Sequence, residues 1–265
     1  MNQRHLKYFY EWFAAYTNSF VFAHEEDQRN IDLKTAHTYR VKNAILDIGN
    51  TLERTRDEKQ LAETMALFHD VGRFQQYRDY GTFKDAVSVN HATLGVAVLK
   101  EFGVLDIIRE DERYLILQAV QHHNVPVLPD ELTGNVRFFT RLLRDADKVD
   151  ILKVVTEYYE KKHEVQNKTV ELDLKDKDAI SDRIFEDFMN GTIIRADDMI
   201  YLNDFKLLQL AWIHDINFRR SFELIANGKY LDKIIETLPA GEKKEKVNEH
   251  VQNFLCHQLS SFVQH

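Results

Sequence analysis

Apolar side chains recur along most of this chain at the spacing of three to four residues that is typical of helices buried on one side. The clearest run ends at residue 70, where Leu61, Met65, Phe68 and His69 fall on one side of a predicted helix. His69 is therefore expected to face the interior, and Asp70 follows it directly. A carboxylate beside a buried histidine is costly unless a positive charge lies near it, and a divalent cation would supply that charge.

The same spacing predicts helices before and after this run. We expect them at residues 6–22, 32–53, 58–70, 90–102, 111–124, 135–162, 179–189, 204–227, 229–237 and 243–262. Gly72 and Gly103 are predicted to end helices, and Asn90 is predicted to cap one. Residues 73–89 lack strong periodicity and predict a loop over the mouth of a pocket. Residues 163–178 are polar and predict a flexible insertion or a subdomain border.

Composition supports a helical protein and narrows the possible partners. The 265 residues include only 9 glycines and 3 prolines, which favours long helices, so we expect an all-α fold. The net charge of −8 argues against a nucleic-acid polymer or an anionic membrane as the partner and favours a small substrate. Cys256 is the only cysteine, which excludes an intramolecular disulfide. Without a signal-peptide pattern or an apolar run of about 18 residues, the expected location is cytoplasmic.

Histidines and acidic residues predicted to face inward come from five separate helices. A single inward histidine is usually a hydrogen-bonded core residue, but a set of them with an aspartate pair indicates a metal site. Ligands with nitrogen and oxygen but no sulfur suit Mn, Fe, Ni, Co, Zn or Mg without choosing among them. The set is His37, His69, Asp70, His91, His122, His123 and either Asp145 or Asp147.

Periodicity leaves two choices open within this set. His122 and His123 each follow apolar residues at helical spacing, so either ring can point inward. Asp145 and Asp147 lie about equally far to either side of the apolar face of their predicted helix.

The order of these motifs resembles the HD superfamily of metal-dependent phosphohydrolases. His37 is followed by His69-Asp70 in a hydrophobic-His-Asp-hydrophobic-Gly context and later by Ala146-Asp147, and the resemblance covers roughly residues 30–160. It implies a helical bundle in which His37, His69, Asp70 and Asp147 bind one divalent metal. His91, His122 and His123 stand where members with two metals add histidines, which implies a second metal or, alternatively, phosphate-binding histidines.

The resemblance also implies a reaction and an organisation of the chain. The reaction is cleavage of a phosphoester of a nucleotide or another small phosphorylated substrate by metal-activated water, with Asp70 positioning the nucleophile. Arg73 and Lys148 are candidate phosphate-binding residues, as are Lys84 and Arg144 less directly, and Asp145 is a candidate to orient a ligand histidine. We expect an N-terminal packing helix at 1–29, an HD-type metal-binding core at 30–162 and C-terminal helices at 163–265 packed on that core in one compact domain.

The substrate and two alternative functions remain open at this level. Gly72-Arg73-Phe74-x-Gln76 with Asn90-His91-Ala92-x-x-Gly95 resembles a bacterial group of HD proteins without an assigned substrate. The alternatives are a non-catalytic protein that binds a nucleotide or metal as a regulator, and oxygen chemistry at a di-iron site. His214-Asp215 repeats the His-Asp dipeptide without a later Ala-Asp partner, so a structural role is expected for it. The sequence pattern does not indicate the oligomeric state.

Overall fold

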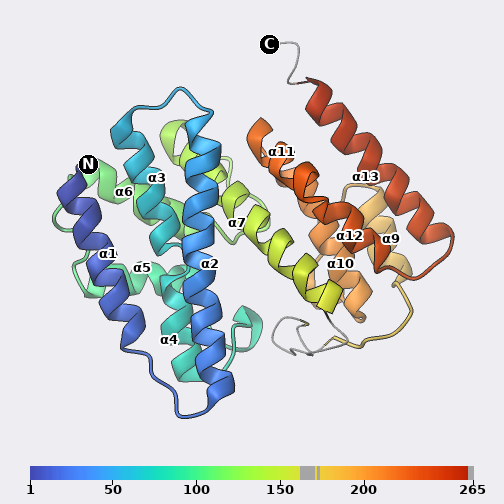
Figure 1. Ribbon diagram of the computed structural model, residues 1–265, viewed down its shortest axis with the longest axis horizontal. Coiled ribbons are helices and arrows are strands. Elements are labelled where there is room, and N and C mark those ends of the chain that lie inside the picture. Colours follow the sequence, from blue (N-terminus) through green and yellow to red (C-terminus); the bar gives the residue numbers. More distant parts are fainter. Residues whose placement is uncertain (162–170, 172–173, 262–265) are drawn as a thin grey trace. The chain divides into compact units, whose positions relative to one another are not determined.

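The computed structural model describes residues 1–161, 171 and 174–261, and the chain divides into two compact units (Figure 1). The first unit is Met1–Asp150 and the second is Ile151–His265. Apart from one isolated β-bridge between Lys175 and Tyr201, the regular structure of the described residues is helical. The prediction of an all-α fold is therefore confirmed. Among the described residues, every helix is too short or too polar to cross a membrane.

Seven α-helices and one 3-10 helix are described in the part of the chain up to residue 161. They are α1 (Gln3–Asn18), α2 (Glu25–Asn50), α3 (Arg56–Phe68), α4 (Val71–Tyr80), η1 (Asp85–Val87), α5 (His91–Glu101), α6 (Glu110–His122) and α7 (Gly134–Lys161). The last of these, α7, continues into the second unit.

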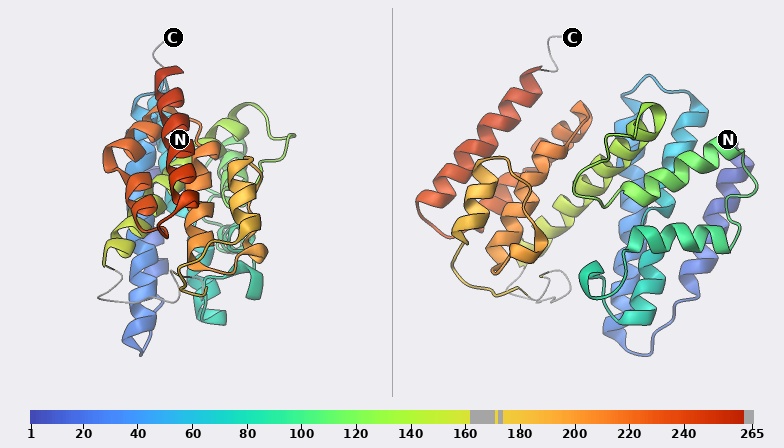
Figure 2. Two further views of the ribbon diagram at one scale, coloured as in Figure 1. Left: turned by 90° about the vertical axis from the view of Figure 1, so that its right-hand side faces the viewer. Right: turned by 180° about the vertical axis from the view of Figure 1, so that it is seen from behind.

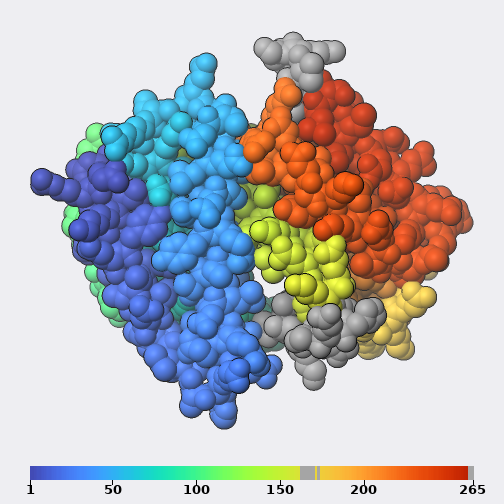
Figure 3. Space-filling model, in the orientation of Figure 1, coloured from blue at the N-terminus to red at the C-terminus, as the bar shows by residue number. Residues whose placement is uncertain are grey.

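The core of the first unit forms where α3 packs against α1, α2 and α6, and where α5 packs against α4 and α6 (Figures 1 and 2). Phe9 and Phe13 of α1 are completely buried. Their rings meet Phe68 and Phe74 edge to face, at centroid distances of 5.4 and 5.9 Å. The aromatic run near the N-terminus is thus a packing helix, as predicted. In the space-filling view, α1 and α2 cover most of the face of this unit that is turned to the viewer (Figure 3).

Two helix starts in the first unit are fixed by side-chain caps. Thr55 and Glu58 form a reciprocal capping box at the start of α3. Asn90 accepts a hydrogen bond from the backbone N–H of Thr93 at 3.0 Å, which confirms it as the cap of α5 and makes His91 the first residue of that helix. Gly103 follows α5 with a φ of +59°, a left-handed conformation that suits the predicted end of the helix.

The predicted loop at residues 73–89 is wrong in its first half. The structure continues from α3 into α4 after only two residues, and Gly72 lies inside α4 instead of ending a helix. Val71, Phe74 and Tyr77 are spaced three residues apart and are buried, so they form an apolar face that the polar residues between them obscure.

The single helix predicted at residues 204–227 is also wrong. The chain forms α10 (Leu202–Ala211), a 3-10 turn η3 (Trp212–Asp215) and α11 (Arg219–Gly228). Ile216 adopts an extended backbone, and the Asn217 side chain donates a hydrogen bond to the Asp215 carbonyl at 2.9 Å. This local side-chain bond competes with the helical pattern and allows the chain to turn.

The second unit also contains α9 (Asp182–Met189), η2 (Ala196–Asp198), α12 (Tyr230–Glu236) and α13 (Glu242–Ser261). The last helix, α13, packs against α9, α11 and α12, and contributes Val247 and Val251 to the core (Figure 2). The insertion predicted at residues 163–178 lies largely outside the described residues. The three-part division of the chain stays a prediction.

Asp204 of α10 fixes the start of this helix. It is completely buried and accepts hydrogen bonds from Ser181 N and Oγ and from the backbone N–H groups of Ile200 and Tyr201, at 2.7–3.0 Å. Asp204→Asn turns one acceptor into a donor that faces other donors, so we expect a loss of about 1–3 kcal/mol of unfolding free energy. Urea denaturation measures it. Asp197→Asn, at an exposed carboxylate, is the control, and equal stability of the two variants would contradict the assignment.

Candidate metal centre

The junction between α3 and α4 presents two polar side chains to the interior of the first unit. His69 and Asp70 are the two residues between these helices, and both are buried. The interruption of the helical ladder at this junction puts the imidazole and the carboxylate next to each other. Four further segments reach the same place, and the residues around Asp70 form two groups.

The first ligand group consists of His37 from α2, His69, Asp147 from α7, and one oxygen of Asp70. The Nε2 atoms of His37 and His69 are 3.2 Å apart. Asp147 Oδ1 lies 3.1 Å from Nε2 of His37 and 3.7 Å from Nε2 of His69. Asp70 Oδ2 lies 3.6 and 3.8 Å from the same two nitrogens. Two helices, α2 and α7, and the junction therefore meet at one point.

The second ligand group consists of His91, His123 and the other oxygen of Asp70. The Nε2 atoms of His91 and His123 are 3.1 Å apart, and Asp70 Oδ1 lies 3.4 and 3.7 Å from them. His91 opens α5 and His123 directly follows α6. Asp70 thus has one carboxylate oxygen toward each histidine pair, and each pair with Asp70 is close enough to hold an ion.

Each of the four rings is oriented by a partner at its other nitrogen. Nδ1 of His69 donates to the Ala66 carbonyl and Nδ1 of His123 donates to the Val120 carbonyl, both at 2.7 Å. Because a carbonyl only accepts, the proton is on Nδ1 in both rings. Partners of this kind are typical of metal-binding histidines, since they fix the ring and the tautomer.

Carboxylates orient the other two rings. Nδ1 of His37 lies 2.7 Å from Asp150, whose other oxygen accepts from Arg40 Nε at 2.7 Å. Nδ1 of His91 lies 2.7 Å from Asp85. Neither aspartate belongs to the set predicted from sequence.

The pKa values follow from burial and charge. Burial lowers the pKa of His69 to about 4 and that of His91 to about 3, so both rings are neutral at pH 7. Burial also opposes charge on His37, but Asp147 and Asp150 outweigh it and raise the pKa of His37 above its ordinary value. Burial disfavours the charged form of Asp70, yet Lys34 and the surrounding groups hold its pKa well below the usual range.

The two groups fit divalent cations. In the second group, with the protons of His91 and His123 on Nδ1, the lone pairs of the two Nε2 atoms face each other, which is unfavourable without a positive charge between them. Two nitrogens bound to one ion at about 2.1 Å lie about 3.0–3.4 Å apart for bond angles between octahedral and tetrahedral, and both pairs fall in this range. Asp147 Oδ1 is buried and accepts no well-oriented hydrogen bond from the described residues.

Two basic side chains, Lys34 and Arg73, lie beside Asp70. Lys34 Nζ lies 2.8 Å from Asp70 Oδ2, and Arg73 Nε lies 3.5 Å from Asp70 Oδ1. The Arg73 guanidinium is also held by the Phe83 carbonyl and by Asp85, at 2.9 Å from the latter. Arg73 therefore ties the connection between α4 and α5 to the metal centre, and its predicted role in phosphate binding stays a prediction.

The Gly-Arg-Phe-x-Gln and Asn-His-Ala-x-x-Gly motifs have a structural explanation. Gly72 and Gly95 let α4 and α5 approach backbone to backbone, because a Cβ on Gly72 would lie 2.5 Å from the Gly95 nitrogen. Gln76 is completely buried and donates from its amide to Asp85, Ser88 and Val89 at 2.8–2.9 Å. The two motifs together position His91 and its partner Asp85.

The other site residues predicted from sequence do not belong to either ligand group. His122 is half-buried, whereas the adjacent His123 is almost completely buried in the second group. Asp145 is completely buried on α7, and residues two apart on a helix point about 200° apart, so it faces away from the direction of Asp147. Lys148 is buried. Arg144 donates to the His123 carbonyl at 2.9 Å. Roles for these residues in the reaction stay predictions.

Sequence reasoning missed Lys34, Asp85 and Asp150. Lys34 and Asp150 each stand three residues from a predicted ligand on the same helix, so helical spacing could have found them. Asp85 lies on the connection between α4 and α5, where no periodicity indicates its direction.

Asp150→Asn tests the orientation of His37. Asparagine lacks the negative charge that holds Nδ1–H of His37 and pairs with Arg40, so we expect metal affinity to fall by about 10–100-fold. Metal titration of the chelator-treated protein measures this affinity. Asp130→Asn, at an exposed position of the same unit, should bind metal as the unchanged protein does. A loss as large in the Asp130 variant would contradict the role of Asp150.

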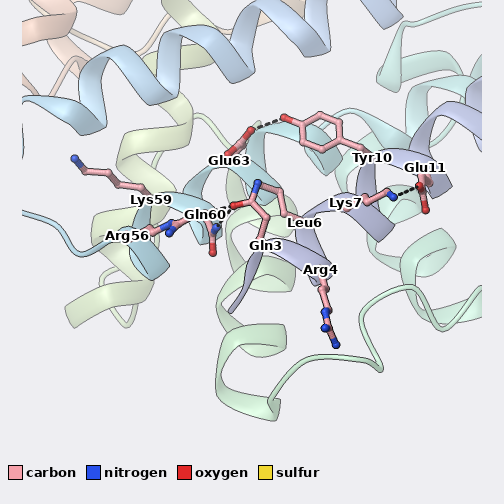
Figure 4. A pocket seen from close by; sticks show the side chains of 10 residues that line it. All are labelled: Gln3, Arg4, Leu6, Lys7, Tyr10, Glu11, Arg56, Lys59, Gln60 and Glu63. Atoms are coloured by element: carbon pink, nitrogen blue, oxygen red, sulfur yellow. Dashed lines mark hydrogen bonds and ion pairs between the residues drawn. The ribbon is translucent and has the colours of Figure 1, made fainter.

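A groove of about 690 Å³ lies elsewhere on the first unit, between α1 and α3 (Figure 4). Its lining includes Tyr10 and Glu63, whose side chains form a hydrogen bond of 2.5 Å, and Arg56, which donates to Gln3 at 2.8 Å. None of the residues in the two ligand groups lines it. It is therefore distinct from the metal centre.

Comparison with known proteins identifies the part of the chain that carries this centre. The HD domain family model matches residues 35–155. No curated protein and no solved structure matches the chain. The matched segment contains all six residues of the two ligand groups, on α2, the α3–α4 junction, α5, the end of α6 and α7. Residues 35–155 are thus an HD domain of the HD-domain superfamily.

Proposed function

We propose that this protein is a metal-dependent phosphohydrolase that cleaves a phosphoester of a nucleotide or another small phosphorylated molecule. The observation that carries the proposal is the position of Asp70, with Oδ2 toward His37 and His69 and Oδ1 toward His91 and His123. A carboxylate in this position can bridge two cations, and paired cations are a common arrangement in phosphatases and nucleases.

His37, His69, Asp70 and Asp147 would hold one cation, and His91, His123 and Asp70 would hold a second. When bound, such cations polarise a phosphoryl oxygen and lower the pKa of a bound water toward neutrality. Asp150, Asp85 and the two helix carbonyls would hold the four rings in the orientation that metal binding requires.

Lys34 and Arg73 would contribute positive charge on the substrate side of Asp70. Lys34 has a side-chain exposure of 20% and Arg73 of 15%, so both are reachable at the edge of a buried centre. A guanidinium or an ammonium group beside a transferring phosphoryl group stabilises the charge that spreads over its oxygens. The hydrogen bonds of Arg73 to Phe83 and Asp85 would hold it in place before substrate binds.

A metal and substrate panel tests this function. Chelator-treated protein is reloaded with Mn, Fe, Ni, Co, Zn or Mg and incubated with p-nitrophenyl phosphate, bis-p-nitrophenyl phosphate and nucleoside mono-, di- and triphosphates. We expect release of phosphate or nitrophenol that requires added metal. Tight nucleotide binding without hydrolysis under every metal would favour a regulatory binding protein. Oxygen consumption by the iron-loaded protein without phosphoester cleavage would favour a di-iron oxygenase.

A further inference from the structure

A third histidine pair lies in the second unit, outside the HD domain. His214 of η3 and His250 of α13 place their Nε2 atoms 3.3 Å apart. These rings are separated by 36 residues in the sequence and are brought together by the fold. His214 belongs to the repeated His-Asp dipeptide, for which a structural role is expected from sequence, and it is exposed.

The geometry of this pair matches that of the two pairs in the metal centre. The ring centroids of His214 and His250 are 5.3 Å apart with an interplanar angle of 69°. The corresponding values are 5.2 Å and 66° for His37 and His69, and 5.0 Å and 73° for His91 and His123. The Nε2–Nε2 distance of 3.3 Å lies within the range of about 3.0–3.4 Å for two nitrogens on one ion.

A hydrogen bond between the two imidazoles would be a long one. Hydrogen bonds from N–H donors are commonly about 2.9–3.0 Å long, and 3.3 Å is beyond that distance. Partial shielding of its ring from water and the neighbouring His250 lower the pKa of His214.

Aromatic side chains hold both rings in place. Phe254, one turn after His250 on α13, meets the His214 ring at a centroid distance of 4.4 Å and an angle of 75°. Phe188 of α9 lies 5.3 Å from the His250 ring. The rings are thus supported from the protein side while the pair itself remains accessible to solvent.

We propose that His214 and His250 form a second, separate binding site for a transition-metal cation such as Zn²⁺, Ni²⁺ or Cu²⁺. Two imidazole nitrogens select these ions over Mg²⁺ or Ca²⁺, which prefer oxygen ligands. With two protein ligands, the remaining coordination positions are open to water or to an added ligand. The site does not depend on the proposed phosphohydrolase function.

Zinc stoichiometry tests the proposal. The chelator-treated full chain is dialysed against Zn²⁺ at pH 7.5 and bound metal is counted by mass spectrometry. We expect His214→Ala and His250→Ala each to bind one Zn²⁺ fewer than the unchanged protein. The double variant should lose no more than either single variant, because one imidazole alone does not hold the ion.

Two comparisons make the result specific. His257→Ala, at an exposed histidine further along α13, should keep the full zinc content. In an Asp70→Asn background, which disables the HD centre, zinc should still be lost on removal of His214.

Circular dichroism confirms that each variant is folded. Electron paramagnetic resonance of the Cu²⁺-loaded protein should report two nitrogen ligands, and this signal should be lost when either histidine is replaced. Equal zinc content of the unchanged protein and both single variants would overturn the site.

Discussion

Asp70→Asn is expected to lower metal-dependent phosphoester hydrolysis by about 100-fold or more and to reduce the metal content of both ligand groups. The reason is that each Asp70 oxygen faces a different histidine pair, and both pairs lose the charge that would balance a cation. The variant also leaves Lys34 without its carboxylate partner at 2.8 Å. A single substitution should therefore affect two ions at once.

Steady-state kinetics and metal analysis on the same protein samples measure this effect. Asp79→Asn is the matched control, because Asp79 is a partly exposed carboxylate that pairs with Arg78 on the same helix. The control should keep its activity and metal content. An Asp70 variant that retains full hydrolysis with both ions bound would rule out the bridging position as the basis of the function.

Gly72→Ala is expected to destabilise the protein by more than about 3 kcal/mol or to prevent folding, although it adds a single methyl group. An added Cβ would overlap the backbone carbonyl of His91 and lie 2.5 Å from the backbone nitrogen of Gly95. Backbone atoms cannot rotate away as a flexible side chain can, so α4 and α5 would have to separate. Their separation would also displace His91 from Asp70.

Chemical denaturation of purified protein, or soluble yield where the variant does not fold, measures this effect. Gly49→Ala is the control, because Gly49 lies within α2 and a Cβ there meets no other atom within 4 Å. Alanine favours a helix over glycine, so Gly49→Ala should raise stability by about 0.5–1 kcal/mol. Equal stability of the two variants would show that the close approach of α4 and α5 is not required.

Much of the candidate metal centre follows from helical spacing. His37, His69 and His91 each lie on an apolar line, and the structure buries all three. Periodicity could not choose between His122 and His123, because both follow apolar residues at helical intervals. The choice depends on where α6 ends, since His123 follows the helix and points Nδ1 at the Val120 carbonyl.

The least predictable part is the segment between Asp70 and His91. Its first half reads as a loop because arginine, glutamine and tyrosine interrupt the apolar face of α4. Gln76 is buried only because its amide finds three acceptors on the connection that follows. The same contacts place Asp85 next to His91. Such pairings depend on chain segments meeting in space, and residue spacing carries no signal for them.

Residue order is enough to predict that this protein is helical, that an inward His-Asp pair needs a compensating cation, and that the motifs resemble those of HD proteins. These conclusions need only local periodicity and the cost of burying charge. The packing of the helices was needed to show that Asp70 lies between two histidine pairs, that Asp85 and Asp150 orient two of the rings, and that His214 meets His250. Each of these depends on atoms from segments distant in the chain approaching within a few ångströms, which is set by helix packing and not by the order of residues within a helix.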